Sequence, residues 1–200
     1  MELKRRGRPR AYEPDVALGK ALDLFRKGGF AATSLDDLSA ATGMNRPSLY
    51  GAFGDKRELY IKSYQRYRDD ARAAMGDLFK EDMPIRKRLA RIYAIALDIY
   101  LGGESPRGCF TVMTAASEAV ADPEIRAMVL EGFSELDKAF VACFRQAKER
   151  GEISASSDPI VLSQLASATI HTIAIRARAG VPRRELEAIV KGAIEVMLGQ

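Results

Sequence analysis

Apolar residues recur every three or four positions along almost the whole chain, which is the spacing of amphipathic helices. After Pro14, for example, Ala17, Ala21 and Phe25 share one helical face. No convincing run alternates between apolar and polar residues as a half-buried strand does. The pattern therefore predicts an all-α fold of about nine helices.

Three of these helices are predicted near the N-terminus, and the second and third of them are short. The first is expected to end at Gly28 and Gly29, because glycine readily adopts the left-handed conformation of a helix C-cap. Thr33 or Ser34 then offers a capping hydroxyl for the second helix, which runs to about Ala41. These three helices are expected to form one small domain.

The stretch "GMNRPSLYGAF" at residues 43–53 predicts the third helix, with Asn45 as its cap and Pro47 at an early position that needs no backbone N–H. Leu49 and Phe53 form its apolar face. A helix this short is marginal in water by itself. Two short helices joined by a tight turn are typical of a helix-turn-helix, in which the second of the two enters the major groove of DNA.

The surrounding segment, "ATSLDDLSAATGMNRPSLYGAFGDKRELY", resembles the TetR family of bacterial transcriptional regulators. The resemblance implies a DNA-binding domain over residues 11–55. Arg46 is the leading candidate for a base contact, because arginine to guanine is the commonest specific pairing. The other implied contacts are to bases or phosphates from Thr33, Asn45 and Ser48, a close approach at Pro47, and to the DNA backbone from Tyr50 and Lys56.

Two positions depart from the family pattern. Many members carry an aromatic residue or a histidine where this chain has Gly51 and Ala52, so a smaller footprint on DNA is expected. The alternative to DNA contact is that Tyr50 only packs within the domain and that Lys56 is only solvated.

The net charge of +4 is concentrated at the N-terminus, where residues 1–10 hold five basic residues and one acidic residue. This segment has too little apolar surface to fold, so a flexible basic arm is predicted. The family resemblance implies that Arg5 and Arg8 reach an adjacent minor groove. A terminus that only improves solubility is the alternative.

The resemblance implies that residues 56–200 form a second domain for ligand binding and dimerisation. Its expected helices cover residues 55–79, 84–102, 106–120, 123–150, 159–179 and 182–197. No catalytic motif occurs, and the single histidine, His171, supplies neither a metal cluster nor a proton relay. We therefore expect no enzyme activity, no metal and no cofactor.

The resemblance implies that this domain senses a small molecule. Aromatic, thioether and other apolar side chains suit an apolar or aromatic effector, although plain core packing is the alternative for each of them. The candidates for ligand contact are Tyr93, Leu97, Tyr100, Cys109, Phe110, Met113, Met128, Phe133 and His171.

The two cysteines are too few for a disulfide framework. If Ser105 caps the following helix, Cys109 lies in its first turn near Arg107, where the helix dipole and the positive charge both favour the thiolate. Some TetR-family regulators are similar in this "PRGC" segment, which suggests a sensor of electrophiles or oxidants. The alternative is a buried thiol that only packs, as we expect for Cys143.

The last two helices are the predicted dimer interface. Their small residues Ala166, Ala174 and Gly192 would let two such pairs from two chains pack as a four-helix bundle. Completion of a monomer core is the alternative. A two-fold dimer reads a palindromic DNA site.

Together these patterns and the family resemblance imply a homodimeric, ligand-responsive repressor that a small molecule releases from a palindromic operator. The alternatives are a thiol sensor acting through Cys109 and a ligand-binding module whose first domain has lost specific DNA affinity. No apolar run approaches the roughly 18 residues of a membrane span, and no apolar segment follows the basic N-terminus as in a secretory signal. A cytoplasmic protein without a membrane partner is expected.

Overall fold

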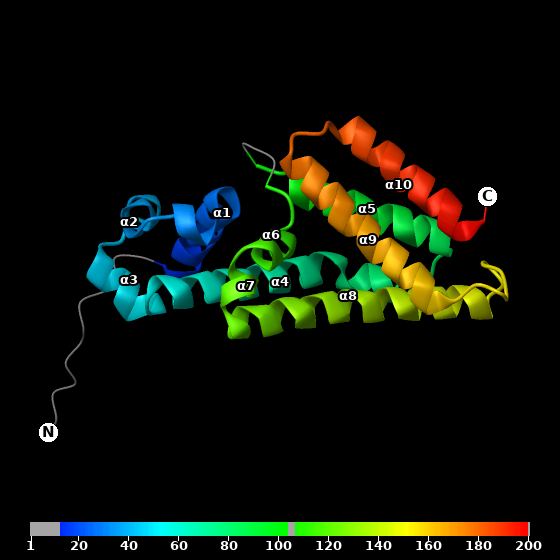
Figure 1. The fold of residues 1–200 in the computed structure, drawn as a ribbon, viewed down its shortest axis with the longest axis horizontal. Coiled ribbons are helices and arrows are strands. Elements are labelled where there is room, and N and C mark those ends of the chain that lie inside the picture. The colour runs from blue at the N-terminus through cyan, green and yellow to red at the C-terminus, as the bar shows by residue number, and fades with distance from the viewer. Residues whose placement is uncertain (1–12, 104–106, 200) are drawn as a thin grey trace, which may run out of the picture. The chain divides into compact units, whose positions relative to one another are not determined.

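The computed structural model describes residues 13–103 and 107–199, and every regular element in these ranges is a helix, which confirms the all-α prediction. The chain divides into two compact units, residues 1–66 and 67–200. The ten helices in Figure 1 are α1 (Pro14–Ala32), α2 (Leu35–Thr42), α3 (Arg46–Phe53), α4 (Lys56–Lys80), α5 (Ile85–Leu101), α6 (Phe110–Ala116), α7 (Glu118–Ala121), α8 (Pro123–Glu149), α9 (Pro159–Arg178) and α10 (Arg183–Leu198).

In the first unit, the regular helix of α1 is interrupted at the predicted glycine pair, because Gly29 has the non-helical angles φ 78° and ψ 178°, and a short helical segment after the kink extends α1 to Ala32. After the kink, the Phe30 ring lies edge-on to Tyr60 with ring centroids 5.3 Å apart. Phe25 lies edge-on to the same tyrosine at 5.0 Å. This aromatic cluster holds α1 against the first part of α4.

In the second unit, α9 packs on α5, α8 and α10 (Figure 1). The small residues Ala166 and Ala174 of α9 are buried in this core, as is Ile194 of α10. Within the described residues, α9 is long and apolar enough to cross a membrane, with a mean hydropathy of 1.3, but half of that stretch is buried inside the fold. This burial is what the core helix of a bundle requires.

The single helix predicted for residues 106–120 is wrong. Ser117, with φ −121° and ψ −85°, separates α6 from the short α7, and α6 begins only at Phe110. The cause lies before the helix, because Gly108 has a positive φ of 63° and the N–H groups of Arg107 and Gly108 both donate to the Tyr100 carbonyl. This tight turn delays the start of the helix.

Candidate nucleic-acid interface and ligand cavity

Local capping and a buried face hold α3 in place. The Asn45 side chain accepts a hydrogen bond from the Ser48 N–H at 2.9 Å, and Gly43, with φ 71°, turns the chain out of α2. Leu49 and Phe53 are buried at 2% and 5% exposure. The cap and the inward face of this helix are therefore as the sequence predicts.

The opposite face of α3 is open to solvent. Arg46, Pro47 and Tyr50 are exposed together with the capping residue Asn45, whereas Ser48 is half-buried. Tyr50 keeps 47% of its surface, which excludes a core-packing role for it within the described structure. Five of the residues predicted to contact DNA are thus presented from one short helix and its cap.

Arg46 has a partner that the sequence reading missed. Its Nη2 and Nε lie 2.7 Å and 3.2 Å from Oδ1 of Asp36 in α2. Both side chains are exposed, and exposed ion pairs contribute little to stability, so this one is readily exchanged for another acceptor. Asp36 lies in the first turn of α2, and its pairing with Arg46 depends on how α2 and α3 cross.

The remaining predicted DNA contacts are distributed differently. Lys56 is half-buried, and its Nζ lies 4.3 Å from the centroid of the Phe30 ring, a cation–π contact that fixes its direction. Thr33 is buried and its hydroxyl donates to the Gly29 carbonyl at 2.7 Å, so the structure does not bring it to the exposed face of α3. Arg5 and Arg8 lie outside the described residues.

The second unit contains a cavity of about 530 Å³ lined mainly by α4 and α8. Four of the predicted ligand residues line it: Tyr100, Cys109, Phe133 and His171. The rest of its apolar wall was not predicted and consists chiefly of Tyr67, Met75, Phe79, Leu136 and Ile170. The cavity volume lies within the usual range of small-molecule sites.

The other predicted ligand residues lie elsewhere. Tyr93 is fully buried, and its hydroxyl donates to the Ala166 carbonyl at 3.1 Å. Burial raises the pKa of this phenol, which therefore stays protonated. Phe110 is also fully buried, edge-on to the cavity residue Tyr67. Both residues belong to the core, which was the alternative reading.

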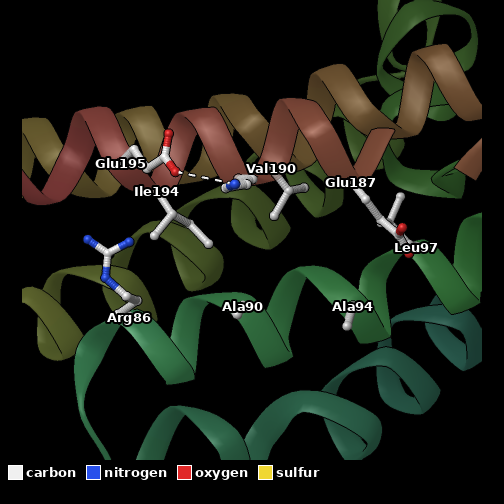
Figure 2. A pocket seen from close by; sticks show the side chains of 9 residues that line it. Arg86, Ala90, Ala94, Leu97, Glu187, Val190, Ile194 and Glu195 are labelled. Atoms are coloured by element: carbon white, nitrogen blue, oxygen red, sulfur yellow. Dashed lines mark ion pairs between the residues drawn. The ribbon is translucent and has the colours of Figure 1, made fainter. Parts of the chain in front are cut away.

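Leu97 lines a separate groove of about 290 Å³ between α5 and α10, which the small residues Ala90 and Ala94 leave open (Figure 2). Met113 and Met128 do not line the large cavity among the residues that the structure assigns to it. The backbone of Met128 instead accepts a hydrogen bond from Arg68 at 3.2 Å.

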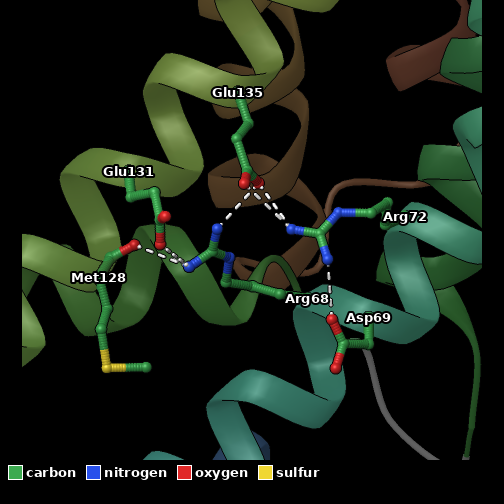
Figure 3. Close-up of polar contacts among 6 residues, drawn as sticks. All are labelled: Arg68, Asp69, Arg72, Met128, Glu131 and Glu135. Atoms are coloured by element: carbon green, nitrogen blue, oxygen red, sulfur yellow. Dashed lines mark hydrogen bonds and ion pairs between the residues drawn. The ribbon is translucent and has the colours of Figure 1, made fainter.

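An ion-pair cluster ties α4 to α8 beside the cavity (Figure 3). Arg68, only 12% exposed, donates to Glu131 at 2.9 Å and to Glu135 at 2.8 Å. Arg72 reaches Glu135 and Asp69, each at 2.9 Å. Burial raises the pKa of Glu135, but the hydrogen bonds and charges of the two arginines outweigh this effect and hold that pKa below its ordinary value.

A signal for this wall exists in the sequence. Arg68, Arg72, Met75 and Phe79 follow one another at intervals of four, three and four residues, which places them on one face of α4. The polar composition of this half of the helix concealed the face, because long arginine side chains cover apolar surface while keeping their charge at the edge.

Besides its charged residues, the cavity wall carries polar groups on Tyr67, Tyr100, Cys109, Thr111 and His171. The hydroxyl of Tyr67 donates to Sγ of Cys109 at 3.4 Å, and Cys109 is the N-cap residue of α6 rather than part of its first turn. The His171 ring lies 5.0 Å from the Phe133 ring. Burial lowers the pKa of His171 against the opposing charge of Asp137, so the imidazole is neutral at neutral pH.

Cys143 behaves as a packing residue. Its thiol is buried and donates weakly to the Phe79 carbonyl at 3.6 Å. Burial raises the pKa of this thiol despite the nearby Arg88, which disfavours the reactive thiolate.

Large exposed apolar residues of the second unit gather on α8 and α9. Leu130 and Ile160 line an outer groove of about 670 Å³ between these helices. In α10, by contrast, Leu186 and Ile194 are buried and Val196 is the exposed apolar residue, at 78%; Ala166 and Ala174 of α9 are also buried in the core. The remaining exposed apolar residues of α9 are Val161, Leu165 and Ile175.

Known proteins match the chain over both units. The family described as bacterial regulatory proteins, tetR family, matches residues 17–62, and the tetracyclin repressor-like C-terminal domain matches residues 86–193. The HTH-type transcriptional repressor ComR of Escherichia coli strain K12 is 30% identical over 184 residues, which cover 92% of this chain and 88% of ComR.

Solved structures agree with these matches. A cysteine-substituted form of the TetR family transcriptional regulator CifR, in complex with 26-base-pair operator DNA, is 28% identical with a TM-score of 0.84 and covers 94% of this chain and 98% of its own. The reduced form of E. coli NemR, at 17% identity, shares the fold with a TM-score of 0.77 and coverage of 92% and 94%.

Proposed function

The chain belongs to the TetR family of bacterial regulatory proteins, and from this premise we propose that it is a homodimeric repressor that binds a palindromic operator through α3. The observation that carries the proposal is the exposed face of α3, on which Arg46, Pro47 and Tyr50 project from a helix held by Leu49 and Phe53. In the complex Arg46 exchanges Asp36 for a guanine edge.

Titration of the full chain against DNA tests this proposal. We expect fluorescence anisotropy to show much tighter binding to an operator selected from randomised DNA than to a scrambled sequence, with an affinity that falls as salt rises. Arg46→Gln should weaken operator binding about tenfold or more, and the α1 variant Lys20→Gln should not. Equal, weak binding to both DNAs would contradict the proposal and favour the ligand-binding module.

The cavity is the proposed site of the effector. Tyr100, Phe133, His171 and Cys109 line it, and an apolar or aromatic molecule fits such a wall. Occupation of the cavity would favour a second packing of α4 and so release DNA. An effector with about 1.4 kcal/mol of preference for that packing shifts the equilibrium tenfold.

The proposed dimer uses α9, one of the two helices predicted for the interface, together with α8. The exposed residues Leu130, Ile160 and Leu165 supply the apolar surface that a second copy would bury, while the apolar face of α10 is already occupied within the protomer. An isologous contact of this kind places two copies of α3 for the two halves of a palindrome.

A thiol sensor is the second candidate, favoured by the position of Cys109 in the cavity wall. If oxidation or alkylation of Cys109 releases DNA, Cys109→Ser should abolish release by hydrogen peroxide and by N-ethylmaleimide, whereas Cys143→Ser should not. Release that persists in Cys109→Ser would exclude this mechanism.

A further inference from the structure

We propose that the effector of this cavity is an amphipathic anion, an apolar or aromatic body with a carboxylate group, and that the carboxylate competes with Glu135 for the arginines of α4. The inference rests on the proposed ligand response and specifies its chemistry. It is argued from the charges, the wall and the ion-pair cluster of the second unit.

The charges around the cavity are unbalanced. Four cations line it, Arg68, Arg72, Lys80 and Lys138, and Glu135 is the one acidic residue among its lining residues, although Glu131 and Asp69 also pair with the two arginines from outside the wall. Over the part of the chain that the structure describes, neither Lys80 nor Lys138 forms an ion pair. A cavity bordered by excess positive charge concentrates anions and disfavours cations.

The wall requires more than a small anion. Met75, Phe79, Leu136 and Ile170 form apolar surface on three helices, and Phe133 adds an aromatic face. Burying this surface under an apolar body is favourable in proportion to the area removed from water. An inorganic anion leaves the surface uncovered, so the body of the ligand must be apolar.

Glu135 occupies the position that a ligand carboxylate would take. It accepts from Arg68 and Arg72 at once, at 2.8 Å and 2.9 Å, and so holds α4 on α8. A second carboxylate in the cavity would repel Glu135 and offer the two guanidinium groups an alternative charged acceptor. The helix α4 is continuous and begins in the first unit. Replacement of the Glu135 ion pairs by a ligand carboxylate would therefore affect the DNA-binding residues through α4 itself.

A matched pair of fluorescent ligands tests the chemical class. Pyrenebutyrate and pyrenebutanol share the aromatic body and differ in charge, and their binding to the full chain is measured by anisotropy without DNA. We expect the butyrate to bind about tenfold more tightly. Arg72→Gln should remove most of this difference, whereas Arg91→Gln, which alters an exposed arginine paired with Glu81 away from the cavity, should preserve it.

Two further variants locate the site. Glu135→Gln should tighten butyrate binding and leave butanol binding unchanged, because the competing charge is gone. Gly76→Leu should block both ligands, since a Cβ at Gly76 meets no atom within 4 Å and the larger side chain extends into the cavity without distorting α4. Equal affinity for the two ligands, or binding that Gly76→Leu does not affect, would overturn the inference.

The same ligands separate this inference from the proposed function. If pyrenebutyrate binds selectively but leaves the operator complex intact, the anion site stands and the proposed ligand response is contradicted. If DNA binding is absent altogether, the repressor proposal fails while the anisotropy comparison still decides the class of ligand.

Discussion

At the scale of single residues, Gly108 sets the position of Cys109 at the cavity. Its φ is 63°, and a Cβ at this position would lie 2.9 Å from the Ala174 carbonyl oxygen and 3.0 Å from Cβ of Arg178. Any side chain there strains the backbone and collides with α9. The turn before α6 therefore depends on this glycine.

Gly108→Ala should lower the free energy of unfolding of the second unit by about 2 kcal/mol, because backbone strain and the clash add. Gly76→Ala is the matched control: this helical glycine faces open space, and the change should raise stability by about 1 kcal/mol. Urea denaturation of both variants measures the difference. Similar values for the two would show that the turn relaxes at no cost.

His171 gives the second unit a dependence on pH. Burial lowers its folded-state pKa below the unfolded value, so the unfolded chain binds the proton more readily. The stabilisation of the folded state by neutral His171 is complete at pH values above the unfolded pKa. It is lost as pH falls from about 6.5 towards the folded pKa. His171→Gln should reduce the change of the urea midpoint with pH between about pH 8 and pH 5. An unchanged slope would assign the effect to other groups.

At the scale of elements, α2 carries a complete capping box. The Ser34 hydroxyl accepts from the Asp37 N–H at 3.0 Å, and the Asp37 carboxylate accepts from the Ser34 N–H at 2.9 Å. The Ser34 side chain and backbone both donate to this carboxylate and lower its pKa. The Asp37 carboxylate therefore stabilises α2 at pH values above the pKa of this group in the unfolded chain. The stabilisation is lost as pH falls through its folded-state pKa.

Ser34→Ala should destabilise the first unit by about 1 kcal/mol, the usual effect of losing an N-cap hydroxyl. Thermal unfolding followed by circular dichroism measures the change. Ser156→Ala, in the exposed loop before α9, is the control and should leave the unfolding temperature unchanged. A transition in Ser34→Ala that matches the parent chain would show that the Asp37 carboxylate alone is sufficient.

At the scale of the whole molecule, we expect DNA affinity to depend on the proposed dimer. Leu165→Lys places a charge on the exposed face of α9 and should give a monomer in sedimentation velocity. Operator affinity should then fall about a hundredfold, because the two half-sites are no longer bound by linked copies of α3. Val196→Lys changes an exposed apolar residue of α10 and should leave both the dimer and DNA binding intact. The opposite pattern would return the interface to the last helix.

The helix-turn-helix could be predicted because its signals are local. The Asn45 cap, the turn at Gly43 and the inward pair Leu49 and Phe53 each depend on residues within about one helical turn. The helix predicted for residues 106–120 failed for the opposite reason. Its start is delayed by hydrogen bonds to Tyr100 in the preceding helix, a contact that neighbouring residues do not encode.

The sequence by itself determined the helical class, the caps of the short helices and the exposed face of α3, because periodicity and capping act over a few residues. Only the tertiary structure decided that Tyr93 and Phe110 are core while Phe133 and His171 face a cavity. Apolar stripes look alike in either role, and what separates them is the distance between helices that are remote in the chain. The same reason applies to Arg68 and Glu135, whose pairing across 67 residues exists only once α4 lies on α8.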